Sequence, residues 1–176
     1  DSSTAASGRN RIETRQHAVS MQNDIAIGDD LLQVVLERRS EEVISNSSGA
    51  LNRRRDTDSG AASYSLRAGA HLASISARGD DSSLYGSNTT WGLGYGYRLT
   101  RALRLNASTG TSFRAPTFNE LYYPGYGVES NRPEQGRNVE AGAYFSDGAN
   151  EASIAWYRNK VRDLLVSTSR CPVEVS

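Results

Sequence analysis

The sequence predicts an all-β fold, an antiparallel up-and-down meander of about eight long strands, and residues 90–113 give the strongest signal. Two arms, one on either side of Thr100 and Arg101, alternate strictly between mainly apolar side chains and small or polar ones. A strand accommodates this pattern, whereas a helical step of about 100° would scatter it. Each arm is about ten residues long, and roughly nine to eleven residues let a tilted strand cross a bilayer.

The two faces of these arms indicate lipid on one side and water on the other. One face is apolar, with Trp91, Tyr97 and Phe113 near its ends, where aromatic girdles meet the lipid boundary. The other face is rich in glycine and serine, which suits the wall of a wide, wet lumen. We therefore predict a membrane-spanning hairpin. A hairpin of a soluble β-sandwich is the alternative that alternation alone also allows.

The composition limits the class of protein. The chain has 176 residues, of which 37% are hydrophobic, and its mean hydropathy of −0.58 is low for a self-contained globule. No apolar run approaches the roughly 18 residues of a transmembrane helix, and no signal peptide is recognisable. Barrels of the bacterial outer membrane have this profile, because half of each strand faces water. Twenty acidic and twenty basic residues leave no net charge, so nothing argues for a nucleic-acid partner.

Before residue 90 the sequence predicts four further strands. They are expected in the ranges 11–27, 31–43, 62–67 and 72–78. Residues 31–43 also fit an amphipathic helix, but the β-branched residues at their centre favour a strand. Residues 44–59 are predicted to form a polar loop. Its Arg53–Arg55 run is expected to be a solvated surface, with a contact to phosphate or lipopolysaccharide as the alternative.

After residue 113 a long connection over 115–135 leads to the last two strands. These strands are expected at 137–145 and 151–159, the second continued by 163–167, around a turn at 147–150. Connection lengths therefore alternate along the chain. The short ones are 28–30, 68–70, 100–101 and 147–150, and the long ones are 44–59, 79–86 and 114–136. Outer-membrane barrels have short turns at one rim and longer loops facing outward, so we expect the same sorting here.

Three motifs between Thr109 and Leu165 resemble the TonB-dependent outer-membrane receptors. The runs TGTSFRAPTFNELYYPGYG, RPEQGRNVEAG and YRNKVRDLL are similar, in this order, to the late barrel strands of that family. The matching positions are Gly110, Phe113, Arg114, Ala115, Pro116, Leu121 and Tyr122; Pro133, Glu134, Gly136, Glu140 and Gly142; and Tyr157, Asn159, Val161, Asp163 and Leu164. Within the family, these motifs are most similar to those of the cobalamin receptor branch. Residues 128–134 depart from the family's usual loop pattern.

The resemblance implies that residues 1–176 are a middle-to-late part of a 22-stranded transmembrane barrel, with the plug domain and the closing strands absent. It implies a receptor of the bacterial outer membrane that binds and imports cobalamin or another large corrinoid or chelate, energised by TonB through the plug. A ferric-siderophore receptor of the same family is one alternative, and a soluble β-sandwich binding module is another. The lone Cys171 indicates either a partner outside the sequence or a free thiol without consequence.

Candidate site residues lie mainly in the long connection. Aromatic side chains there suit the flat face of a large ligand, since they offer apolar area and, in tyrosine, a hydroxyl. They are Phe118, Tyr122, Tyr123 and Tyr126. The alternative is that Tyr122 and Tyr123 only anchor the loop. The resemblance adds Thr4 as a ligand-contacting loop residue. Arg114 and Glu140 are expected to pair and to help fold the loop over the barrel mouth.

Other chemistry finds little support in the sequence. The surroundings of His17 and His71 offer no metal-ligand spacing, and no catalytic constellation is present, so we expect neither an enzyme nor a cofactor. An eight-stranded part of a larger barrel exposes two unpaired edges and an apolar face that would otherwise contact membrane lipid. We therefore expect the isolated chain to self-associate.

Overall fold

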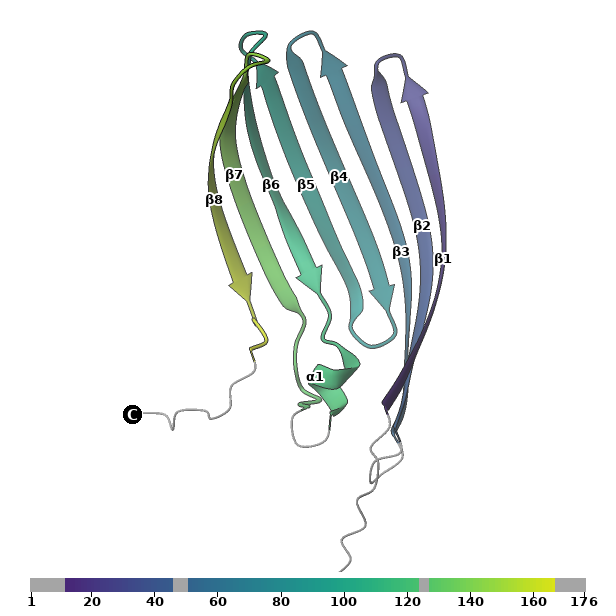
Figure 1. Ribbon diagram of the computed structural model, residues 1–176. Coiled ribbons are helices and arrows are strands. Elements are labelled where there is room, and N and C mark those ends of the chain that lie inside the picture. Colours follow the sequence, from purple (N-terminus) through teal and green to yellow (C-terminus); the bar gives the residue numbers. More distant parts are fainter. Residues whose placement is uncertain (1–11, 46–50, 124–126, 167–176) are drawn as a thin grey trace, which may run out of the picture.

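Eight antiparallel strands form one meandering sheet in which each strand pairs with the next along the chain (Figure 1). The computed structural model describes residues 12–45, 51–123 and 127–166. The strands are β1 (Ile12–Ile27), β2 (Asp30–Ser45), β3 (Leu51–Ala68), β4 (His71–Ser82), β5 (Gly86–Arg98), β6 (Leu103–Arg114), β7 (Glu134–Ser146) and β8 (Glu151–Arg162). The predicted all-β meander is confirmed, and residues 31–43 form a strand rather than a helix.

The outer side of the sheet is apolar. Residues that lie opposite each other in adjacent strands share a side, so the register assigns every side chain to one of the two sides. Val19 and Ile154, on strands at opposite edges, are 77% and 74% exposed. The alternation predicted for residues 90–113 is confirmed. The outer side of the central strands carries Ile75, Trp91, Leu93, Tyr95, Tyr97 and Leu105.

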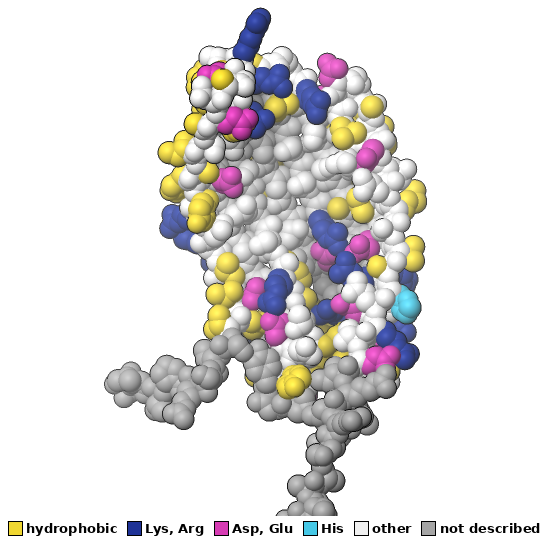
Figure 2. All heavy atoms as spheres, viewed as in Figure 1, with side chains coloured by type: hydrophobic (Ala, Val, Ile, Leu, Met, Phe, Trp, Pro, Cys, Tyr) yellow, Lys and Arg dark blue, Asp and Glu magenta, His cyan; other side chains and the backbone are white. Residues whose placement is uncertain are grey.

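The inner side is polar and lined by small residues. Gly92, for example, lies opposite Ser76 on one neighbour and Gly110 on the other. Figure 2 views this side, whose centre is mostly neutral polar side chains and backbone, with hydrophobic side chains at the margins. A cavity of about 580 Å³ is lined by residues from Gln22 on β1 to Asn138 on β7. All described strands belong to one sheet, which contradicts the β-sandwich alternative.

Two strands extend further than the sequence indicates. β3 already begins at Leu51 and β4 continues to Ser82, so the predicted loops at 44–59 and 79–86 are wrong over most of their length. Charge pairing between strands explains the difference, because Arg55 lies opposite Glu41 and Arg54 opposite Glu42. A run that is too polar for a strand on its own is stabilised by its neighbour.

The last strand is shorter than predicted. β8 ends at Arg162, and Asp163 has a φ of 54°, in the left-handed region that ends regular pairing. The continuation predicted over 163–167 is therefore wrong for its described residues.

One end of the sheet, the turn end, holds only tight connections. Gly28 and Gly69 have φ values of 62° and 60°, which glycine adopts without the penalty of a Cβ. In the last turn, the Asp147 carboxylate accepts hydrogen bonds from the backbone N–H groups of Ala149 and Asn150, at 2.9 and 2.7 Å. The opposite end, the loop end, carries the long connection, which was predicted over 115–135 and lies between Arg114 and Glu134. The predicted sorting of connection lengths holds only in part, because β4 and β5 are joined at this end by a short turn at 83–85.

A short helix, α1 (Phe118–Tyr122), interrupts the long connection and lies at the loop end (Figure 1). The sequence alone does not predict this helix. In the part of the chain that the structure describes, no helix has the length and apolar character needed to cross a membrane.

The two-sided sheet predicts opposite responses to a charge at one level of the wall. Leu93 faces outward and the next ladder pair places Ser108 inward. We expect Leu93→Arg to destabilise the lipid-embedded protein by about 2–4 kcal/mol, because a charge then contacts hydrocarbon. Ser108→Arg should cost far less. Urea unfolding of the full-length protein in lipid vesicles measures both, and equal losses would contradict the assignment of the sides.

Candidate functional site

The loop end of the inner side is the candidate site, because the long connection folds onto it there. Within the described residues, the only buried hydrophobic side chains other than proline are Phe118 and Leu121 of α1 and Val43 of β2, at 6%, 2% and 2% exposure. Pro116 is fully buried beside them in the chain. A small core therefore forms at the loop end, where the connection meets the wall, while the rest of the sheet has none. We call this region the inner mouth.

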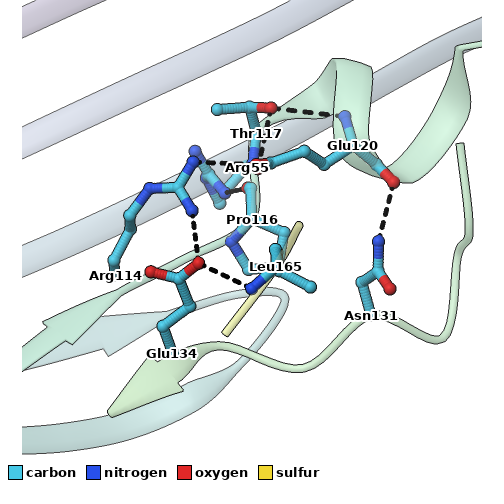
Figure 3. Close-up of polar contacts among 8 residues, drawn as sticks. All are labelled: Arg55, Arg114, Pro116, Thr117, Glu120, Asn131, Glu134 and Leu165. Carbon is cyan, nitrogen blue, oxygen red and sulfur yellow. Dashed lines mark hydrogen bonds and ion pairs between the residues drawn. The ribbon is translucent and has the colours of Figure 1, made fainter. Parts of the chain in front are cut away.

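Arg55 of β3 attaches the connection to the wall (Figure 3). Its Nη1 donates a hydrogen bond of 2.9 Å to the carbonyl oxygen of Pro116, 61 residues away in the chain. Its Nη2 lies 2.7 Å from Glu41 Oε2, and its guanidinium lies 5.2 Å from the centre of the Phe118 ring. The side chains of Arg55 and Glu41 are only 10% and 16% exposed. A shielded ion pair of this kind fixes geometry, since breaking it leaves a poorly solvated charge.

A second arginine of the same strand contacts the same helix. The guanidinium of Arg53 lies 5.7 Å from the centre of the Tyr122 ring, and the Tyr122 and Phe118 rings are stacked 6.2 Å apart. Arg53 and Arg55 share the inner side because they are two residues apart. The expectation that the Arg53–Arg55 run is a solvated loop surface is therefore wrong for Arg55, which is buried.

The start of α1 is closed by a capping box. Thr117 Oγ1 accepts a 3.2 Å hydrogen bond from the Glu120 N–H, and Glu120 Oε2 accepts a 2.7 Å hydrogen bond from the Thr117 N–H. Arg114 donates to Glu120 Oε1 at 2.8 Å and to Glu134 Oε1 at 2.9 Å, and the latter oxygen also accepts from the Leu165 N–H (Figure 3). Arg114 therefore joins the end of β6, the helix and the start of β7.

These contacts lower the pKa of the Glu120 carboxyl. Burial alone would raise it, but the hydrogen bonds from the Thr117 backbone and the Arg114 guanidinium outweigh burial and hold the pKa below its ordinary value. Glu120 is consequently ionised at neutral pH and supports both the cap and the arginine.

The predicted pair of Arg114 and Glu140 is wrong. Arg114 lies opposite Glu134 in the β6–β7 register, whereas Glu140 lies opposite Ser108. Six residues of strand, about 20 Å, separate the two positions along the ladder. Both residues do belong to the inner side, so the expected side is right and the expected partner is not. Arg114 still contacts the long connection, but its partners are Glu120 and Glu134 rather than Glu140.

The predicted ligand-contacting aromatic residues occupy different environments. Phe118 is buried, Tyr122 is half-buried under Arg53, and Tyr123 is 45% exposed at the end of α1. Contacts of this kind fit the anchoring alternative for Tyr122. Tyr126 and Thr4 lie outside the described residues, as does Cys171.

A polar pocket of about 200 Å³, not predicted from the sequence, opens beside the inner mouth. Arg78 lies 2.8 Å from Asp80 and 3.6 Å from Glu37, and Arg39 lies 2.9 Å from Glu37. Figure 2 shows dark-blue and magenta side chains next to one another on the inner side, in the half of the sheet toward the loop end. Alternation is the signal that was available, because oppositely charged residues two apart, such as Arg78 and Asp80, share one side.

Three buried polar atoms in this pocket have no hydrogen-bond partner among the described residues. They are Arg39 Nε, Tyr85 Oη and Asn88 Nδ2. Burial raises the pKa of the Tyr85 hydroxyl, so this group keeps its proton at neutral pH. These three groups can each donate a hydrogen bond that no described residue accepts. A ligand or a water molecule that offers oxygen atoms would satisfy them.

Comparison with known proteins finds one family and several relatives. A family model described as TonB dependent receptor-like, beta-barrel, matches residues 2–175. The Vitamin B12 transporter BtuB of Photobacterium profundum is 38% identical over 90 residues, 51% of this chain and 15% of that protein. The protein of the same name from Vibrio vulnificus is 39% identical over 93 residues, 53% of this chain and 15% of that protein.

Solved structures share the fold. The siderophore receptor PirA from Pseudomonas aeruginosa matches 84% of this chain and 31% of its own, with a TM-score of 0.76 and 21% identity. At that identity the likeness concerns the fold alone. The similar region spans about 15% of the length of the curated relatives and under a third of the solved one.

Loss of Arg55 should release the connection. We expect Arg55→Met to weaken docking of residues 115–133 by about 3 kcal/mol, because Glu41 is left shielded and unpaired and Pro116 loses its donor. Cleavage by a glutamyl endopeptidase after the exposed Glu129 should accelerate at least tenfold in the full-length protein. Arg54→Met is the matched control, since Arg54 faces the outer side. Equal cleavage rates in the two variants would contradict the role of Arg55.

Docking of α1 should also depend on pH. Because the folded pKa of Glu120 lies below its ordinary value of 4.5, its contribution is fully present above about pH 4.5 and is lost as pH falls through the folded pKa. Hydrogen exchange of residues 117–123, corrected for intrinsic rates, should accelerate below that range. Glu120→Gln should exchange faster at neutral pH and lose the pH dependence, and an unchanged profile in this variant would exclude Glu120 as the group responsible.

Proposed function

Because this chain belongs to the TonB dependent receptor-like β-barrel family, we propose that it forms part of a receptor that binds and imports cobalamin. The family and its vitamin B12 transporter relatives are proteins of the bacterial outer membrane, which agrees with the apolar outer side of the sheet. In this proposal TonB supplies energy through a plug domain outside the chain. The contribution of residues 1–176 is a walled pathway and part of the ligand-recognition surface.

The observation that carries the cobalamin assignment is sequence similarity. The relatives at 38% and 39% identity over about half of the chain are both named vitamin B12 transporters. A ferric-siderophore receptor is the second candidate, favoured by the solved siderophore receptor with the same fold. Identity of 21% makes that support weaker than the support for cobalamin.

The inner mouth is where we place ligand recognition. Tyr123 offers an exposed ring next to the anchored helix, and Tyr126 and Thr4 are proposed to complete the contact. Phe118 and Tyr122 hold the helix in position, so that ordering the loop does not draw on binding energy. The unpartnered donors of Arg39 and Asn88 are suited to carbonyl oxygens at the periphery of a large ligand.

The two edge strands of the sheet support the proposal that the chain is one part of a barrel wall. Within the described sheet, β1 and β8 each pair along one edge only. We propose that strands of the complete barrel pair there. The isolated chain should then self-associate in detergent-free buffer, and a monodisperse monomer by light scattering would contradict this.

Binding by the full-length receptor tests the assignment and the residues together. We expect saturable binding of cyanocobalamin, weakened about tenfold by Tyr123→Ala and by Tyr126→Ala, since removing a contacting ring costs about 1–2 kcal/mol. Tyr144→Ala, on the inner side near the turn end, is the matched control and should leave affinity unchanged. Tight binding of a ferric siderophore without binding of cyanocobalamin would replace the assignment with the second candidate.

A further inference from the structure

Four basic side chains line a groove on the outer side of β7 and β8, toward the loop end. The register places Arg137 opposite Lys160 and Arg158 opposite the outward-facing Val139. Arg162 follows two residues after Lys160 and so shares its side. The groove has a volume of about 500 Å³. We call these four residues and the space between them the basic groove.

The cations of the basic groove have no counter-charge on their own side of the sheet. From β6 to β8 the register assigns no aspartate or glutamate to the outer side. Among the described residues, no ion pair involves any of the four. Arginines on the outer side of β2 and β3 behave differently, because Arg38 lies 3.7 Å from Asp58 and Arg54 lies 3.0 Å from Asp56. The basic groove therefore carries four uncompensated positive charges.

The basic groove lies directly next to apolar residues on the outer side of the same two strands. Toward the turn end, the same side of β7 and β8 carries Val139, Trp156 and Ile154, and the last two are 58% and 74% exposed. An apolar surface that changes to a cluster of cations within one strand matches the boundary between acyl chains and headgroups.

We propose that the basic groove binds the phosphorylated headgroup of an anionic glycolipid of the lipid A type in the outer leaflet. The loop end faces outward in barrels with this sorting of connections, which puts the groove in that leaflet. Arginine pairs with phosphate through two parallel hydrogen bonds, and three arginines with one lysine match a headgroup carrying more than one phosphate. The acyl chains then lie along Trp156 and Ile154. The site is on the opposite side of the wall from the inner mouth and is independent of the imported ligand.

Titration of the detergent-solubilised full-length receptor with diphosphorylated lipid A tests the proposal. We compare the wild type with the triple variant R158Q/K160Q/R162Q and with the matched control R38Q/R54Q, whose cations lie on the same side but are already paired. A heat-induced shift in gel mobility checks that each barrel is folded. We expect about a hundredfold weaker binding by the triple variant and less than a twofold change in the control. Dephosphorylated lipid A should bind the wild type as weakly as diphosphorylated lipid A binds the triple variant.

Three results would overturn the proposal. Equal affinity of the wild type and the triple variant would exclude the basic groove. Equal affinity of the wild type for phosphorylated and dephosphorylated lipid A would exclude recognition of phosphate. Displacement of lipid A by millimolar inorganic phosphate would assign the groove to a free anion.

Discussion

Strand register is the constraint on which the rest of the molecule depends. Side chains alternate with a period of two, so a slip of one residue would turn the whole apolar side inward and the glycine and serine side toward lipid. In the observed pairing Trp91, Leu93 and Tyr95 lie opposite Ala77, Ile75 and Ala73 of β4, and Tyr95 also lies opposite Ala107 of β6. The apolar outer side and the polar inner side therefore both follow from the same register, kept along eight strands.

The polar inner side creates a second requirement, which the charged residues of β2, β3 and β4 meet. Carboxylates and guanidinium groups there pair with one another, as Glu41 does with Arg55 and Asp80 does with Arg78. Arg55 also binds a backbone carbonyl of the long connection. The same side chain thus balances charge within the wall and positions the inner mouth.

Sequence alone predicted the sides of the strands and the tight turns, because alternation and turn-forming residues are local signals. It did not predict that β3 begins at Leu51, since the charges that stabilise this polar stretch belong to β2. The prediction of ion-pair partners fails for the same reason. Arg114 and Glu140 share a side, but only the register shows that Arg114 lies opposite Glu134. The polar pocket was missed because Arg39 belongs to β2, whereas Tyr85 and Asn88 lie more than forty residues later, around the start of β5.

The contact between Arg55 and Pro116 has a consequence for the order of folding. Pairing in the meander joins neighbours along the chain, so the hairpins closed by tight turns form at small entropic cost, whereas β6 and β7 are separated by residues 115–133. The Arg55–Pro116 hydrogen bond spans 61 residues and needs β3 and β6 to be in place first. Formation of this bond is consequently a late event, and burial of Phe118 reports that the intervening sheet has been assembled.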